Sequence, residues 1–202
     1  MTSPYLELVQ THAALLQRHD LPLLETLRGR ELPPRAEPAA DAPVALLLSP
    51  HPDDECITGA LALRLARECG YRVVNLPVTF GSNPRRQKER KHELERACAW
   101  LGFEIAEIEA DGFARVNAQA REKEPEAWLD KVETVAARIR QLKPAIVVCP
   151  NHDDGHATHI GTYLLATDAL ALAKHRCWLA QTEFWRAMAN PNLLVESRIT
   201  DV

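Results

Sequence analysis

The chain has 202 residues, which is enough for one well-packed α/β domain and short for two. Its net charge of -4 and its pI near 6.1 exclude the strongly basic surface that nucleic acids and anionic membranes attract. No stretch approaches the roughly 20 apolar residues of a membrane span, and the N-terminus lacks the basic start and apolar core of a signal peptide.

The first 42 residues differ in pattern from the rest of the chain. Apolar residues recur at helical spacing over residues 5–29, which predicts one or two amphipathic helices. Residues 31–43 are rich in proline, alanine and acidic residues, which indicates a linker or surface loop. We therefore predict a helical N-terminal extension over residues 1–42 and one α/β domain over residues 43–202.

Strands alternate with helices after the linker. The apolar run at residues 44–49 is typical of a strand that is buried on both faces. Further strands are predicted over residues 72–80, 103–108, 145–149, 183–185 and 193–196. Helices are predicted over residues 57–69, 85–101, 125–142 and 158–174, and a polar loop over 111–123 is expected to cover the mouth of a pocket. The alternation predicts a Rossmann-like, mostly parallel sheet with helices on both faces.

Two polar clusters directly follow predicted strands. The string Ser-Pro-His-Pro-Asp-Asp-Glu at residues 49–55 ends the first strand, and residues 151–159, with three histidines and two aspartates, follow the fourth. Functional groups of open parallel sheets gather beyond the carboxyl ends of the strands. We therefore expect the two clusters to share one site.

The residue types and spacings in these clusters suit a catalytic metal site. His51 and Asp54 are three apart in a loop that can turn both side chains toward one point. His156 and His159 are three apart at the start of a helix, on one face. Two imidazoles and one carboxylate leave a fourth position open for water, as in catalytic zinc sites, and Asp53 is then available as a general base. We expect one Zn²⁺ per chain, although these ligands would also accept Fe²⁺ or another divalent ion.

Each of these residues also has a purely structural explanation. Asp54 could cap the helix that begins near residue 57, and Asp153 or Asp154 could cap the helix that begins near residue 158. The matched ligand types after two strands favour the metal site over separate caps. Because glycine-rich phosphate-binding loops are absent from the sequence, the α/β pattern does not indicate nucleotide binding.

The sequence resembles the PIG-L or LmbE-like family of N-acetylglucosaminyl deacetylases from about residue 44 onward. The resemblance is carried by His-Pro-Asp-Asp-Glu at 51–55, Thr-Phe-Gly at 79–81, Arg-Lys-His-Glu-Leu at 90–94, Leu-Gly at 101–102 and the His-x-x-His pair at 156 and 159. It implies a zinc-dependent hydrolase that removes an acetyl or other acyl group from an amino sugar or amino-sugar conjugate.

The resemblance also implies a role for each motif residue. His51, Asp54 and His159 would bind zinc. Asp53 would be the base that activates the attacking water. His156 would be the electrophile or acid that stabilises the tetrahedral oxyanion and protonates the leaving amine.

The second motif departs from the family's usual His-Pro-Asp-His, because Ala157 and Thr158 occupy its two central positions. The usual aspartate sits where it could orient or charge-tune a motif histidine. Asp154, or else Asp153, is expected to substitute for it in the second shell of the site.

Arg85 and Arg90 follow the second predicted strand, a region where basic residues of the family can hold the substrate. A solvated helix face explains both arginines at least as well, because residues 85–96 are densely charged. The resemblance implies a small-molecule amino-sugar substrate, and we expect neither a nucleic acid partner nor a membrane span. The sequence leaves formation of a homo-oligomer open.

Two other functions remain as alternatives. A zinc amidohydrolase of a non-sugar amide would use the same metal and base. A catalytically inactive metal-binding scaffold would need neither Asp53 nor His156, so their presence favours an enzyme.

The five cysteines are odd in number and contain no CxxC pair, which indicates reduced thiols and predicts a cytoplasmic protein.

Overall fold

The computed structural model describes residues 37–57, 59–108, 112–184 and 199–201, together with Gln10 and Ala14. The predicted helices over residues 5–29, apart from Gln10 and Ala14, residues 31–36 of the predicted linker and the predicted strand over 193–196 lie outside the described residues. The domain boundary predicted between residues 42 and 43 therefore stays a prediction. Within the described part of the chain, no helix combines the length and apolarity that a bilayer crossing requires.

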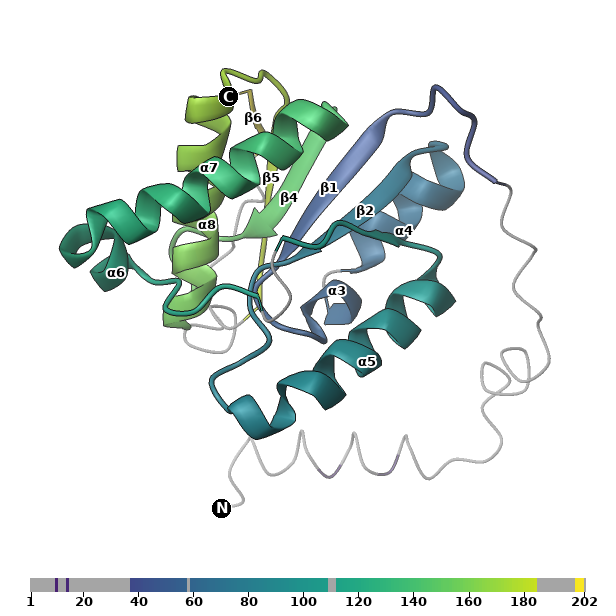
Figure 1. Cartoon of the computed structure of the whole chain (residues 1–202). Helices are drawn as coiled ribbons and strands as arrows, with labels where there is room; N and C mark the ends of the chain where they lie inside the picture. The colour runs from purple at the N-terminus through teal and green to yellow at the C-terminus, as the bar shows by residue number, and fades with distance from the viewer. Residues whose placement is uncertain are drawn as a thin grey trace, which may run out of the picture. The chain divides into compact units, whose positions relative to one another are not determined.

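A six-stranded sheet forms the centre of the fold, in the order β3-β2-β1-β4-β5-β6 (Figure 1). Its strands are β1 (Val44–Ser49), β2 (Arg72–Pro77), β3 (Glu104–Ile105), β4 (Ile146–Pro150), β5 (Trp178–Thr182) and β6 (Ile199–Asp201). The first five strands are parallel, and only the pairing of β6 with β5 is antiparallel. The predicted mostly parallel α/β sheet is confirmed.

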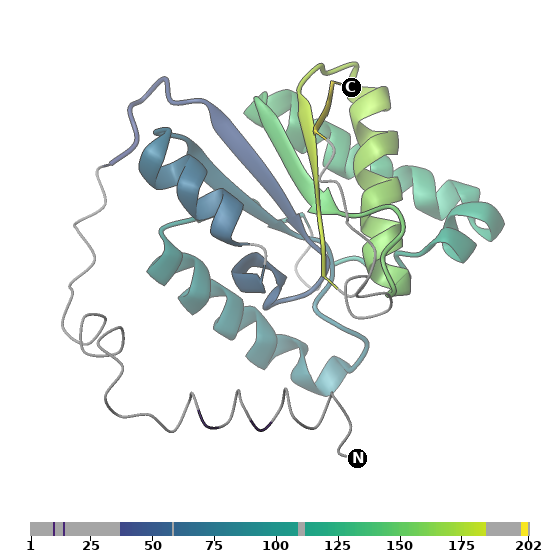
Figure 2. The ribbon, with the colours of Figure 1, turned by 180° about the vertical axis from the view of Figure 1, so that it is seen from behind.

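Helices cover both faces of the sheet, as the pattern predicted (Figure 2). They are α3 (Asp54–Ile57), α4 (Gly59–Glu68), α5 (Pro84–Leu101), α6 (Ala118–Lys123), α7 (Pro125–Leu142) and α8 (Ala157–Ala173). Leu46 and Leu48 of β1 belong to a core with α7 and α8, while Ala45 and Leu47 belong to a core with α4 and α5. The apolar run of β1 is continuous because successive side chains point into two different cores.

The order of the strands fixes where a ligand can bind. The chain leaves β1 toward β2 on one side and later returns to place β4 on the other side of β1. The loops that follow β1 and β4 therefore diverge at the carboxyl ends of two neighbouring strands. In open parallel sheets this divergence creates the crevice that holds the ligand.

Three predicted elements differ from the structure. The strand predicted at residues 183–185 is wrong at residues 183 and 184, because the strand that pairs with β4 is β5, at Trp178–Thr182, and it ends before them. The predicted loop over 111–123 contains α6, which is capped by Asn117, whose Oδ1 accepts the N–H of Ala120 at 2.8 Å. Helical structure begins at Asp54 rather than near residue 57, so Asp54 lies in a first helical turn and not in a loop.

Candidate metal centre

The two polar clusters meet at one edge of the sheet, as the sequence predicted. β1 and β4 are parallel neighbours, and each is followed by one of the clusters. His51 lies in the loop after β1 and Asp54 in the first turn of α3. His156 caps the N-terminus of α8, and His159 lies in the first turn of that helix. Residues 105 positions apart in the chain are thus brought together by one pair of strands.

Three histidines form the centre of this site. The ring centroids of His51 and His159 are 5.3 Å apart, and the ring of His156 lies 5.1 Å from the first and 4.9 Å from the second. One nitrogen from each ring lies within 4.8 Å of the others, so the group could hold a metal ion. The ring of Phe184 makes an edge-to-face contact with the ring of His159, at 4.7 Å between centroids.

The buried carboxylate of Asp54 lies between two of these rings. Its Oδ2 accepts the backbone N–H of His51 at 2.9 Å, and lies 3.2 Å from Nδ1 of His51 and 3.5 Å from Nε2 of His159. Ligand atoms held about 2.0–2.1 Å from a tetrahedral ion are about 3.3–3.4 Å apart. The two measured separations fit that spacing, so His51, Asp54 and His159 suit a zinc-like ion.

His156 differs from the other two histidines in its hydrogen bonding. Its Nδ1 accepts the backbone N–H of Thr158 at 3.3 Å, at the N-terminus of α8. A neutral ring that accepts at Nδ1 carries its proton on Nε2, as assigned from this hydrogen bond. Burial lowers the pKa of His156, and the neighbouring rings of His159 and His51 lower it further. The arrangement favours a neutral Nε2–H donor over a metal ligand.

Asp154 supports the buried side of the site. Its side chain is fully buried, and its Oδ1 accepts the backbone N–H of His156 at 2.8 Å. The same oxygen lies 3.3 Å from Nδ1 of His159, although the pair is not aligned as a hydrogen bond. Asp153, the other aspartate considered from the sequence, is exposed. Of the two, Asp154 occupies the position from which a carboxylate orients a metal-binding histidine.

Asp53 reaches the cavity from a strained backbone. Its φ of 110° lies in the left-handed region, which non-glycine residues rarely adopt, and its side chain is 67% exposed. Burial and the adjacent Asp54 raise the pKa of the Asp53 carboxyl, while Arg90, 3.4 Å away, and the nearby histidines lower it in part. A carboxylate with a raised pKa beside a metal site is a candidate general base.

A cavity of about 990 Å³ opens above these residues. Besides the two motif clusters, three other segments line it, with Thr79, Gly81 and Ser82 after β2, Gln87 and Arg90 on α5, and Arg115 and Asn117 before α6. Arg90 thus reaches the cavity, whereas Arg85, exposed in the first turn of α5, is not among its lining residues.

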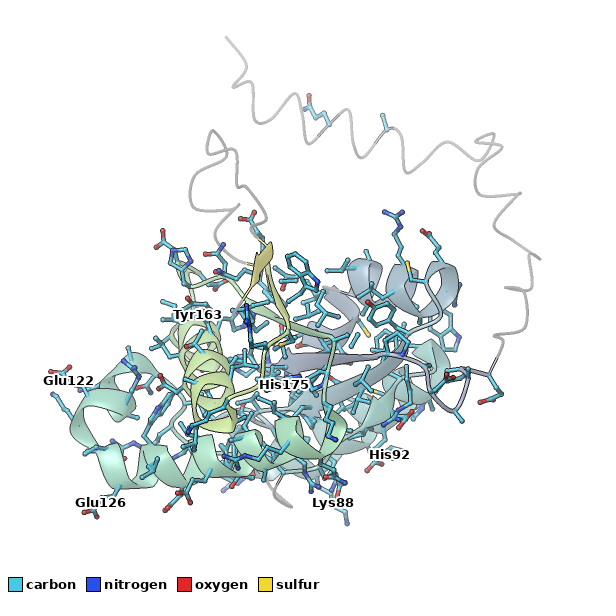
Figure 3. All side chains as sticks on the ribbon, turned by 90° about the horizontal axis from the view of Figure 1, so that it is seen from above. Lys88, His92, Glu122, Glu126, Tyr163 and His175 are labelled. Atoms are coloured by element: carbon cyan, nitrogen blue, oxygen red, sulfur yellow. The ribbon has the colours of Figure 1, made fainter. Side chains whose placement is uncertain are left out.

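The sequence placed residues 111–123 at the mouth of a pocket, and residues 112–117 do line the cavity, but it did not name Gln87, Arg115 or Asn117 individually. Residues 112–117 reach the cavity because a bridge between Thr79 and Gly112 ties this segment to the edge of the sheet. That long-range pairing has no local signal. His92 on α5 and His175 after α8, both labelled in Figure 3, are not among the residues that line the cavity.

Comparison with known proteins adds the family. The profile of the PIG-L family, described as GlcNAc-PI de-N-acetylase, matches residues 46–170, which is more than half of the chain. The chain belongs to the PIG-L family. The match begins within β1 and ends within α8, so it contains both polar clusters.

Individual PIG-L relatives are distant. A 1D-myo-inositol 2-acetamido-2-deoxy-alpha-D-glucopyranoside deacetylase from Mycolicibacterium smegmatis is 29% identical over 178 residues, covering 74% of this chain and 61% of the relative. The chain thus spans less than two thirds of that relative's length. A zinc-inhibited form of a teicoplanin deacetylase has a TM-score of 0.57 at 15% identity, covering 77% of this chain and 73% of the other.

A third similar structure is the 4-carboxy-2-hydroxymuconate hydratase of Pseudomonas putida, with a TM-score of 0.52 at 18% identity over 69% of this chain and 66% of the other. At these identities the two structures share the fold with this chain, and the fold alone does not decide the reaction. The residues of the site, rather than the fold, indicate the reaction.

Proposed function

We propose that this chain is a metal-dependent N-deacetylase that hydrolyses the acylated amino group of an amino sugar or amino-sugar conjugate. The observation that carries the proposal is the convergence of His51, Asp54 and His159, with Oδ2 of Asp54 3.2 and 3.5 Å from the two ring nitrogens, beside the cavity-facing carboxylate of Asp53. Membership of the PIG-L family and the deacetylase name of the bacterial relative support the same reaction.

We assign one Zn²⁺ to His51, Asp54 and His159. The hydrogen bond from Thr158 argues against His156 as the third ligand, because a ring that accepts at Nδ1 presents a proton and not a lone pair at Nε2. When bound, the ion supplies Lewis acidity, which polarises an amide carbonyl and makes water a better nucleophile near neutral pH. Asp154, beside Nδ1 of His159, orients that ring.

Asp53 is the general base in this proposal. It takes a proton from the water as the water oxygen attacks the carbonyl carbon of the amide. His156, held neutral, donates its Nε2–H to the carbonyl oxygen as negative charge develops there. The carbon–nitrogen bond then breaks as the proton carried by Asp53, and not one from His156 as the family resemblance implied, passes to the departing nitrogen. The products are a free amine and a carboxylic acid, which then loses its proton to solvent.

The cavity favours a hydroxyl-rich small molecule. Gln87, Asn117 and the rest of the 112–117 segment line the space above the motif residues, so polar residues and backbone surround it. We further propose a reducing, cytoplasmic compartment, because the five cysteines, all within the described residues, form no disulfide.

Acetate release tests the proposal. Zinc-loaded protein is incubated with free, inositol-linked, nucleotide-linked and lipid-linked N-acetylhexosamines, and with N-acetyl amino acids as non-sugar amides. At least one sugar should release acetate, and Asp53→Asn should lower its turnover by about 10²–10⁴-fold with unchanged zinc content. Asp130→Asn, an exposed aspartate on α7, is the matched control.

Three outcomes would contradict parts of the proposal. Turnover by Asp53→Asn at the parent rate would exclude Asp53 as the base. Hydrolysis of the amino acid amides alone would exclude an amino-sugar substrate. Zinc binding without acetate release from any compound would favour an inactive metal-binding scaffold.

A further inference from the structure

The peptide that joins Pro52 to Asp53 is held in an unfavourable conformation. A non-glycine residue in a sparsely populated region of φ and ψ costs about 1–3 kcal/mol and persists only where its surroundings enforce it. Neighbouring residues hold the backbone of Asp53 in place. Its N–H donates to Glu55 Oε2 at 3.0 Å, and its carbonyl accepts the N–H groups of Cys56 and Ile57 at 2.9 and 3.1 Å.

The other side of this peptide is held from a distant helix. Nη2 of Arg90, on α5, donates to the carbonyl oxygen of Pro52 at 2.7 Å and lies 3.4 Å from Oδ2 of Asp53. One guanidinium nitrogen thus contacts both the carbonyl before the strained residue and the carboxylate itself. Hydrogen bonds from a charged donor are stronger than those between neutral groups. The side chain of Arg90 is 23% exposed, so solvent screens this contact only in part.

The loop after β2 is shaped to admit this guanidinium. A Cβ atom at Gly81 would lie 2.6 Å from Nη1 of Arg90, closer than non-bonded atoms approach, and Gly81 has a φ of 87°. The loop is fixed in turn, because Gly81 donates its N–H to Thr79 Oγ1 at 3.3 Å and its carbonyl accepts Gln87 Nε2 at 2.9 Å. Two loops and one helix therefore enclose the head of Arg90.

We infer that Arg90 is a positioning residue for Asp53, and not a residue whose main contact is the substrate. The inference rests on the proposed function, in which Asp53 is the base. Arg90 fixes where the carboxylate lies and in which direction its oxygens face. Since general-base catalysis requires the base within hydrogen-bond reach of the proton that it accepts, loosening this carboxylate slows the chemical step.

Steady-state kinetics separate positioning from substrate binding. Arg90→Gln should lower kcat by about 10–100-fold, the scale of a small misplacement of a reacting group, with KM changed less than about 2-fold. Zinc content should equal that of the parent. Arg90→Lys keeps the charge but not the planar donor, so it should recover only part of kcat. Arg86→Gln, exposed on the same helix, is the control.

Gly81→Ala and crystal structures test the same role of Arg90 if Arg90→Gln does not fold. Gly81→Ala leaves Arg90 in the chain but places a methyl carbon 2.6 Å from Nη1, so the guanidinium must shift and kcat should fall in the same direction at unchanged KM. Crystal structures of Arg90→Gln and Gly81→Ala should show that Asp53 has left its φ near 110° or that the Pro52 carbonyl has turned.

The outcomes distinguish this inference from the proposed function. A raised KM at parental kcat would make Arg90 a substrate-binding residue and overturn the inference. If the parent releases no acetate, the proposed function fails, and the crystal structures alone decide whether Arg90 positions Asp53. An unchanged Asp53 backbone in both variants would then overturn the inference as well.

Discussion

Replacing Asp154 tests whether this buried carboxylate supports the candidate metal centre. Asp154→Ala leaves the backbone N–H of His156 without the acceptor that it reaches at 2.8 Å. This hydrogen bond is partly buried and has a charged acceptor, and such a bond contributes about 1.5–3 kcal/mol of a typical stability of about 5–15 kcal/mol. For a chain of this size, each kcal/mol corresponds to about 2–4 °C, so the melting temperature of the metal-free protein should fall by roughly 3–12 °C.

Asp154→Asn separates the metal from the fold. Asparagine keeps an oxygen for the N–H of His156 but removes the negative charge 3.3 Å from Nδ1 of His159. We expect nearly parental melting of the metal-free protein and a zinc affinity about 10–100-fold lower, as is usual when the partner of a metal-binding histidine is lost. The affinity is measured by competition with a chromogenic chelator.

Asp153→Asn provides the matched control, because Asp153 is the same residue type at the adjacent position but is exposed. Its zinc affinity should equal that of the parent. The reasoning would be refuted if Asp154→Asn bound zinc as tightly as the parent, or if Asp153→Asn lost as much affinity as Asp154→Asn.

Two predictions concern packing and pH. The methyl group of Gly161→Ala would lie 2.4 Å from the carbonyl oxygen of Val116, so urea unfolding should show a loss of about 1–3 kcal/mol, and an unchanged stability would contradict this close approach. Burial raises the pKa of Asp168, but hydrogen bonds from Arg121 and Trp128 outweigh burial and lower it below 3.8. The ionised group therefore stabilises the protein above pH 3.8, and this contribution is lost as the pH falls through the lowered pKa. The difference in unfolding free energy between parent and Asp168→Asn should shrink toward acid pH, and a constant difference from pH 7 to acid would contradict it.

The sequence predicted those elements whose local pattern and tertiary environment agree. The bounds of β1 match the prediction because both of its faces are buried, so every residue in it is apolar or small. The bounds of α7 match because Pro125 begins the helix and an apolar stripe continues to Leu142. β5 was missed because its burial is uneven: Trp178 at its start is exposed and Gln181 is polar. The pairings with β4 and β6 make these residues a strand.

The same contrast holds for the candidate site. Motif spacing and topology were enough to bring His51 and His159 together, since both follow neighbouring parallel strands. They could not choose between Asp153 and Asp154, because the choice depends on which side chain the fold buries. They also could not find the contact of Arg90 with the Pro52 carbonyl, which joins residues 38 positions apart. Arg90 looked like one of many charges on an exposed helix.

Two features of the second motif are connected. One is the departure from the family's usual residues at positions 157 and 158, and the other is the set of contacts that Asp154 makes. Without an aspartate at position 158, Nδ1 of His156 has the backbone N–H of Thr158 as its partner, and a donor there favours the neutral ring. Asp154 lies against His159 and the backbone of His156 rather than against Nδ1 of His156. Its negative charge is therefore next to the proposed metal ligand and not next to Nδ1 of the proposed oxyanion donor. It follows that His156 contributes a hydrogen bond rather than a positive charge, so His156→Gln, which retains an N–H donor, should keep more activity than His156→Ala.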